Sequence, residues 1–165
     1  MDSPETEISS TLTPGSITEK KLLFTFNHRL GETYKKLLVS VQPHRGESQP
    51  SELSIGINDE QNHLIGFMIG DLIKDQDGIT AFSNDLSKNI GIDSLYTPRA
   101  VGATIAHIVS SGIIGRWYSA PEKRLSPDAK KMYYKYLAGN KRLVVAPPSA
   151  ETQFRYVISA NKGIL

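Results

Sequence analysis

The stretch SLYTPRAVGATIAHIVSSG, residues 94–112, constrains the fold more than any other part of the chain. A strand-like run over residues 90–97 stops at Pro98, and an amphipathic helix follows at about residues 99–110 with hardly a turn between them. The apolar side chains of this helix form one stripe: Val101, Ile105, Ile108 and Val109. A short strand at residues 115–119 comes next. This succession predicts an α/β (α+β) fold, with a mixed central sheet flanked by helices on both faces.

Apolar patterning predicts further elements along the chain. Apolar runs indicate strands at residues 21–28, 53–59, 63–73, 142–147 and 153–160. Three glycines inside two of these runs are typical of bulges or of close backbone approach: Gly56, Gly66 and Gly70. Apolar residues at helical spacing indicate helices at residues 31–42 and 125–139, and the polar stretch FSNDLSKN, residues 82–89, indicates a loop.

The chain divides into a polar start and one domain. Residues 1–18 are rich in Ser, Thr, Pro and Glu and hold few large apolar side chains, which predicts a flexible acidic N-terminal arm. Residues 19–165 have the length of a single domain with one core. The chain has no cysteine, no apolar run of about 18 residues and no signal-peptide pattern, which together favour a cytoplasmic protein without a membrane span.

Charge is distributed unevenly along the sequence. The net charge is +2, yet residues 116–165 carry ten Lys or Arg against three Asp or Glu. Such a basic region favours an anionic partner, which could be a nucleotide-bearing cofactor, a nucleic acid or an acidic protein. A solvated lysine-rich helix face explains the same composition without any partner.

The turn before the predicted helix is the strongest candidate for chemistry. The first amides of a helix lack intrahelical partners and carry partial positive charge, so they suit a phosphate. Gly102 has no Cβ and would let the backbone approach such a group. Close packing of the helix on the sheet explains the glycine equally well. The four histidines show no metal-ligand spacing, so we expect no metal site.

From residue 53 onward the chain resembles the GNAT superfamily of acyl-CoA-dependent N-acyltransferases. Members carry Gln or Arg, two residues, Gly, one residue and Gly or Ala where a helix follows a splayed strand; Arg99 and Gly102 match, and Thr104 replaces the last small residue. A later helix often has the pattern Asn-x-x-Ala-x-x-x-Tyr, and Ser126, Ala129 and Tyr133 fall at those spacings. The order of elements is also similar.

The resemblance implies transfer of an acetyl group from acetyl-CoA to an amine. It implies that Leu95 and Thr97 offer backbone groups to the pantetheine arm and that Ser126 lies beside the thiol. Tyr133 would protonate the departing thiolate, and Asp93 would accept the proton of the amine. The pyrophosphate would be held by six consecutive residues: Arg99, Ala100, Val101, Gly102, Ala103 and Thr104.

Two other functions stay open at this point. A GNAT-like fold without catalysis could serve as a protein-interaction module. A small basic domain could bind nucleic acid, since the aromatic residues of the run RWYS, residues 116–119, lie among basic ones and could stack on bases. The same run also resembles, more weakly, GNAT-like proteins carried by bacteriophages.

Overall fold

A computed structural model describes residues 5–6, 10–30, 32–44, 51–85, 89–91, 97–120, 131, 135, 137, 139–146 and 156–160. These residues contain one helix with defined bounds, α1 (Thr97–Ser110, fourteen residues), and residues 131, 135 and 137 are also helical. The strands are β1 (Glu5–Thr6), β2 (Lys21–Leu30), β3 (Thr33–Pro43), β4 (Glu52–Asp59), β5 (Leu64–Lys74), β6 (Thr80–Asp85), β7 (Ile90–Gly91), β8 (Arg116–Ala120), β9 (Leu143–Ala146) and β10 (Tyr156–Ala160).

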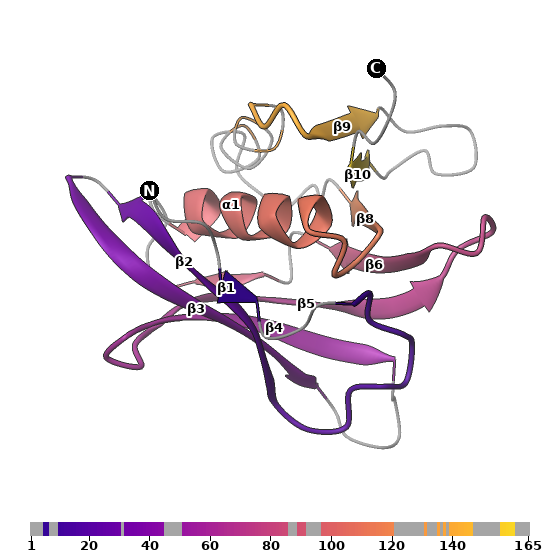
Figure 1. Cartoon of the computed structure of the whole chain (residues 1–165), viewed down its shortest axis with the longest axis horizontal. Coiled ribbons are helices and arrows are strands. Elements are labelled where there is room, and N and C mark those ends of the chain that lie inside the picture. Colours follow the sequence, from indigo (N-terminus) through magenta and orange to yellow (C-terminus); the bar gives the residue numbers. More distant parts are fainter. Residues whose placement is uncertain are drawn as a thin grey trace.

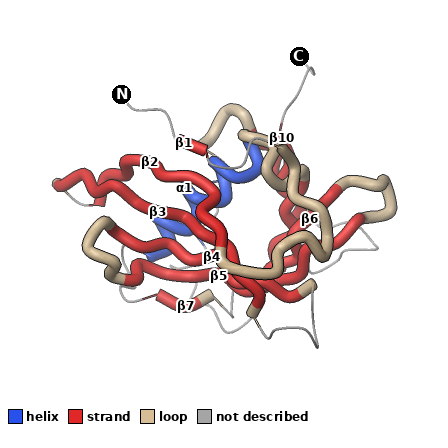
Figure 2. Tube along the Cα trace, turned by 60° about the horizontal axis from the view of Figure 1, so that its bottom comes forward, coloured by secondary structure: helices blue, strands red, loops and turns tan. Residues whose placement is uncertain are grey.

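All the described strands belong to one sheet, in the order β1-β2-β3-β4-β5-β6-β8-β10-β9. The short strand β7 lies off this path and pairs with β5, at residues of β5 other than those that pair with β6. Neighbouring described strands are antiparallel except β6 and β8, which are parallel. Parallel neighbours require a crossover connection, and α1 is part of the connection here. The strands curl partly around α1, which lies on one face of the sheet (Figures 1 and 2).

The core lies between α1 and the sheet. Ten residues of α1 are buried, and the six apolar ones among them that line its inner stripe belong to the same cluster as the inward side chains of β2 to β6 and β8: Ala100, Val101, Ile105, Ala106, Ile108 and Val109. Trp117 of β8 is fully buried, and its ring centroid lies 4.7 Å from that of Phe82 on β6. The parallel pair is therefore packed through two large aromatic side chains.

The mixed sheet that the sequence predicts is confirmed. Helices on both faces are not shown, because α1 covers one face and the predicted helix over residues 125–139 lies largely outside the described residues. Of that helix, Lys131 and Lys135 are exposed and Leu137 is buried, and Gly139 follows in a turn.

The helix predicted for residues 31–42 is wrong. This segment is strand β3, which pairs with β2 and β4. Two patterns overlap here: Leu37, Leu38 and Val41 have helical spacing, but Leu37, Val39 and Val41 also alternate and are all fully buried. Pairing with strands on both sides decides between the two, because a helix could bury only one stripe of the segment.

The loop predicted for residues 82–89 is wrong at its start. Residues 80–85 form β6, in the middle of the sheet between β5 and β8. Polar composition is misleading here because Asn84, 2% exposed, donates from Nδ2 to the Ile69 carbonyl at 3.0 Å and to Asn89 Oδ1 at 2.7 Å. Hydrogen bonds to these partners allow a polar side chain to be buried.

Two apolar side chains of the segment predicted as an arm are part of the core. Leu12 and Ile17 are 6% and 5% exposed and belong to the core cluster. The Leu12 amide donates to the Ile113 carbonyl at 2.9 Å, and Thr11 Oγ1 donates to the Gly112 carbonyl at 2.7 Å. Residues 11–17 are therefore docked beside the turn that follows α1.

Candidate functional site

The candidate site is the junction where the parallel ladder ends and α1 begins. The last parallel pair is Asp85 with Ala120. Beyond it, β7 pairs with β5 through Gly66–Gly91 and Phe67–Ile90, and with no other described strand. Within the described part of the chain, β7 therefore continues along β5 without β8 beside it.

Gly91 on β7 allows α1 to begin close to β7. A Cβ at Gly91 would overlap the side chain of Thr97, the first residue of α1. Thr97 Oγ1 in turn donates to the Ile65 carbonyl on β5 at 3.3 Å. The beginning of α1 is thus held against β5 and β7 by a close approach that only glycine permits and by a side-chain hydrogen bond.

The first turn of α1 is where helix amides lack intrahelical acceptors. The helix begins at Thr97, so the amides of Thr97 and Arg99 precede the first intrahelical hydrogen bond, while Pro98 has no N–H. No acidic residue occurs in the first turn to offset the partial positive charge of the helix dipole. An anion placed at this turn would meet the amide and the guanidinium of Arg99.

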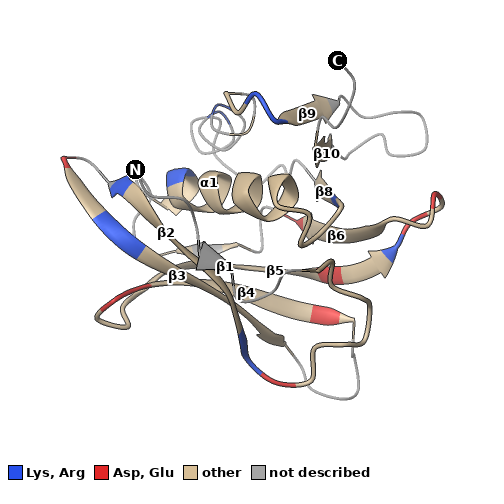
Figure 3. Ribbon diagram, viewed as in Figure 1, with Lys and Arg blue, Asp and Glu red and all other residues tan. Residues whose placement is uncertain are grey.

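The start of α1 carries a basic residue (blue in Figure 3), and its position in the helix sequence identifies this residue as Arg99. Its Nε is buried, with no hydrogen-bond partner among the described residues. The pKa of the His28 imidazole on β2 is lowered mainly by burial. The charge of His107 and then that of Arg99 lower it further. A buried donor without a partner is costly, and an anion is the group that would satisfy it.

The remaining residues of the predicted phosphate cradle lie further into the helix than expected. Val101, Gly102, Ala103 and Thr104 all lie beyond the first turn, where backbone amides donate to carbonyls four residues back. Thr104 Oγ1 donates to the Ala100 carbonyl at 2.7 Å and is fully buried, so its hydroxyl already has an acceptor. The cradle predicted from Arg99 to Thr104 stays a prediction, and of those six residues only Arg99 lies before the first intrahelical hydrogen bond.

Four predicted site residues lie outside the described residues: Asp93, Leu95, Ser126 and Tyr133. Their roles in holding pantetheine, accepting a proton and protonating a thiolate stay predictions. Thr97 is described, and it is 6% exposed. The structure thus brings Thr97, Arg99 and Gly91 together at one junction, and the sequence did not point to Gly91.

A pair of half-buried histidines, His28 on β2 and His107 on α1, adjoins this region. The Phe26 ring lies between them, with centroids 5.8 Å from His28 and 4.5 Å from His107. Burial lowers the pKa of both imidazoles; the charges of His107 and Arg99 lower that of His28 further, and the charge of Arg142 does the same to His107. Both imidazoles therefore stay neutral in the folded protein at a pH where the same two histidines begin to bind protons in the unfolded chain.

The histidine pair predicts a loss of stability in mild acid. Because both folded pKa values lie below the unfolded value of about 6.5, the unfolded state binds more protons, and stability falls as the pH drops through that value. We expect the melting temperature to fall from about pH 7.5 to about pH 5.5. The fall should be smaller in a His28→Gln/His107→Gln variant, measured by calorimetric scans at each pH. His63→Gln, with a side chain 74% exposed in the parent, is the control; an equal fall in all three proteins would contradict this origin.

The tightest charge cluster has a structural role at the other end of β5. Asp75 Oδ2 accepts from Arg116 at 2.9 Å and from Tyr118 Oη at 2.9 Å, and Asp75 Oδ1 accepts the amides of Asp77 and Ile79. Burial opposes ionisation of Asp75, but these bonds outweigh it and lower its pKa. The cluster ties the turn between β5 and β6 to β8.

Two further findings concern the described residues. They contain no group of three or more His, Cys, Asp or Glu side chains that could hold a metal ion. No helix among them has both the length and the apolar character to span a membrane.

Comparison with known proteins gives similarities to solved structures but none at the level of sequence. No protein-family model matches the chain, and no curated protein sequence resembles it. One solved structure with a weak similarity to the chain is the N-terminal domain of a ribosomal-protein-alanine acetyltransferase from Clostridium acetobutylicum, with 10% identity and a TM-score of 0.35, over 73% of this chain and 88% of that one.

Proposed function

We propose that the protein is a GNAT-type N-acetyltransferase that uses acetyl-CoA and an amine acceptor. One observation carries the proposal. The helix that bears the Arg99-x-x-Gly102 pattern begins where the parallel pair β6 and β8 ends and β7 continues along β5 alone. This is the position, after a splayed strand, that the family resemblance implies for the pyrophosphate-binding helix.

The chemistry of the junction fits a pyrophosphate. The Arg99 amide, the Arg99 guanidinium and the helix dipole all favour negative charge at the same place. The buried Nε of Arg99 has no partner among the described residues, and such a ligand would supply one. We assign the phosphate contacts to Arg99, with Ala100 next to it, and packing of α1 to the buried residues Val101 and Gly102.

The reaction requires two proton transfers. The amine nitrogen bonds to the thioester carbonyl carbon, the carbon–sulfur bond breaks, the nitrogen loses a proton and the thiolate gains one. Asp93 is the proposed acceptor for the amine proton. Tyr133 is the proposed donor to sulfur, because a phenol with an ordinary pKa of about 10 is protonated at neutral pH.

Calorimetric titration with acetyl-CoA tests the proposal. Replacing Arg99 with alanine removes a charge-assisted contact that contributes about 1.5–3 kcal/mol, so we expect affinity to fall about tenfold or more. The matched control is Lys74→Ala, which removes an exposed positive charge at the far end of β5 and should leave affinity unchanged. Equal melting temperatures of the variants would show that the loss is local.

Two results would reject the proposal. If the parent protein does not bind acetyl-CoA at millimolar concentration, the fold serves another purpose, and the interaction module becomes the better explanation. If it binds but Arg99→Ala and Lys74→Ala behave alike, the ligand is held elsewhere than at the start of α1.

A further inference from the structure

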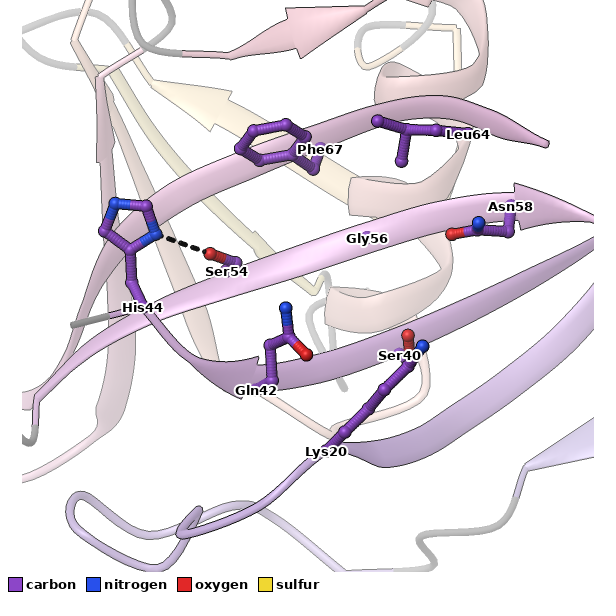
Figure 4. A pocket seen from close by; sticks show the side chains of 9 residues that line it. All are labelled: Lys20, Ser40, Gln42, His44, Ser54, Gly56, Asn58, Leu64 and Phe67. Carbon is purple, nitrogen blue, oxygen red and sulfur yellow. Dashed lines mark hydrogen bonds between the residues drawn. The ribbon is translucent and has the colours of Figure 1, made fainter. Parts of the chain in front are cut away.

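The face of the sheet opposite α1 carries a polar hollow over β3, β4 and β5 (Figure 4). Its centre is a row of three paired residues: Ser40 on β3, Gly56 on β4 and Phe67 on β5. The residues that alternate with these along β3 and β4, such as Val39 and Ile55, are fully buried on the other face. The hollow has a volume of about 360 Å³ and opens away from the core.

Gly56 forms the floor of this hollow, and nothing in the fold requires a glycine there. It is absent from the described glycines with positive φ. A Cβ would meet only Asn58 Oδ1 at 3.7 Å and Ser40 Oγ at 4.0 Å, which are ordinary contacts. Glycine weakens a strand interior relative to alanine. What the missing side chain provides is open space beside the half-buried Phe67 ring.

A hydrogen-bonded pair fixes one wall of the hollow. Ser54 is 7% exposed, and its Oγ lies 2.8 Å from Nδ1 of His44, which comes from the end of β3. This bond orients the imidazole, so its other nitrogen is available to a ligand. Gln42, directly opposite Ser54, and Asn58 line the hollow with amide groups that both donate and accept.

The charge of the hollow is positive. Lys20 lines it, and no Asp or Glu is among its lining residues. The Lys20 ammonium group lies beside Ser40 (Figure 4) and favours a phosphate there, and a bare glycine floor beside an aromatic ring favours a flat ring. A volume of about 360 Å³ is near the lower end of the range of roughly 300–1,000 Å³ for small-molecule sites.

From these features we infer that the outer face of β3–β5 is a binding site for a nucleoside monophosphate. The base lies on Gly56 against Phe67, with its polar edges towards Gln42 and Asn58, and the phosphate lies at Lys20 beside Ser40. The site is on the opposite face of the sheet from α1 and does not depend on the proposed acetyl transfer.

Titration with AMP, GMP, CMP and UMP, each beside its nucleoside, tests this inference. At least one monophosphate should bind saturably, and its nucleoside should bind at least about tenfold more weakly because the phosphate contact is lost. Lys20→Ala should cause a similar loss. Its neighbour Lys21, which is exposed and does not line the hollow, provides the matched control, and Lys21→Ala should have no effect.

Filling the floor gives the second arm of the test. Gly56→Val should abolish binding, and the smaller Gly56→Ala should weaken it. The melting temperature of each variant shows whether it keeps the fold. If Gly56→Val does not, Gly56→Ala provides the test. Acetyl-CoA binding should be unchanged in both, and Arg99→Ala should keep nucleotide binding, so the two proposals can fail separately. The inference is overturned if no monophosphate binds at millimolar concentration, if binding survives both glycine variants, or if these variants also abolish acetyl-CoA binding.

Discussion

Replacing Gly70 with alanine is expected to destabilise the protein by about 3 kcal/mol or more and to lower its melting temperature by about 10 °C. Gly70 lies on β5 opposite Asn84 of β6 and is buried. A Cβ there would overlap both the Ser83 carbonyl oxygen and the Phe82 ring. The oxygen belongs to the backbone of a paired strand, so relief of the overlap requires β5 and β6 to separate.

Gly56→Ala is the matched control for this substitution. It adds the same methyl group to the neighbouring strand β4, where the nearest atoms are 3.7 Å and 4.0 Å away. We expect its melting temperature to equal or slightly exceed that of the parent, because alanine restricts the unfolded chain more than glycine does. Similar losses in the two variants would contradict a steric origin at Gly70.

Removing the two buried side chains of the N-terminal segment should have an effect of comparable size. In a Leu12→Ala/Ile17→Ala variant, each truncation leaves a cavity in the core cluster, and each costs about 2–5 kcal/mol in well-packed proteins. We expect the melting temperature to fall by about 10 °C or more, measured by differential scanning calorimetry.

Two exposed positions in the same segment supply the control. Thr13→Ala/Glu19→Ala changes as many residues without removing buried apolar surface, and it should melt within a degree or two, about the effect of ordinary surface substitutions. If the Leu12→Ala/Ile17→Ala variant melts at the same temperature as the parent, residues 11–17 do not stabilise the domain.

The sequence predicts most of the strands because their apolar runs pair with neighbours close in the chain. The runs at residues 21–28, 53–59 and 63–73 correspond to β2, β4 and β5. It fails at β3, where the same leucines and valines satisfy helical spacing and alternation at once. Which pattern applies is decided by the strands on either side, and that information is not local.

The buried polar and small residues are the least predictable part of the site. The sequence predicts a loop at Asn84 and a bulge or close backbone approach at Gly70. In the structure these two residues are opposite one another on paired strands in the middle of the sheet. Gly91 gave no signal, because its role depends on contact with Thr97 across residues 92–96. By contrast, the position of Arg99 near the start of a helix follows from the apolar stripe of residues 101–109, and its role in binding stays a prediction.

The order of strands in the sheet differs from their order of synthesis, and this sets when the sheet can be completed. β10 pairs with β8 on one side and β9 on the other, although β9 is made first. Until residues 156–160 have left the ribosome, the outer edge of β8 has no described strand to pair with, and β9 is separated from the sheet. The growing chain therefore presents an open edge at Trp117 and its neighbours during translation of some forty residues between β8 and the end of β10. Such an edge can pair with another chain, so this interval is when a nascent copy is most exposed to aggregation.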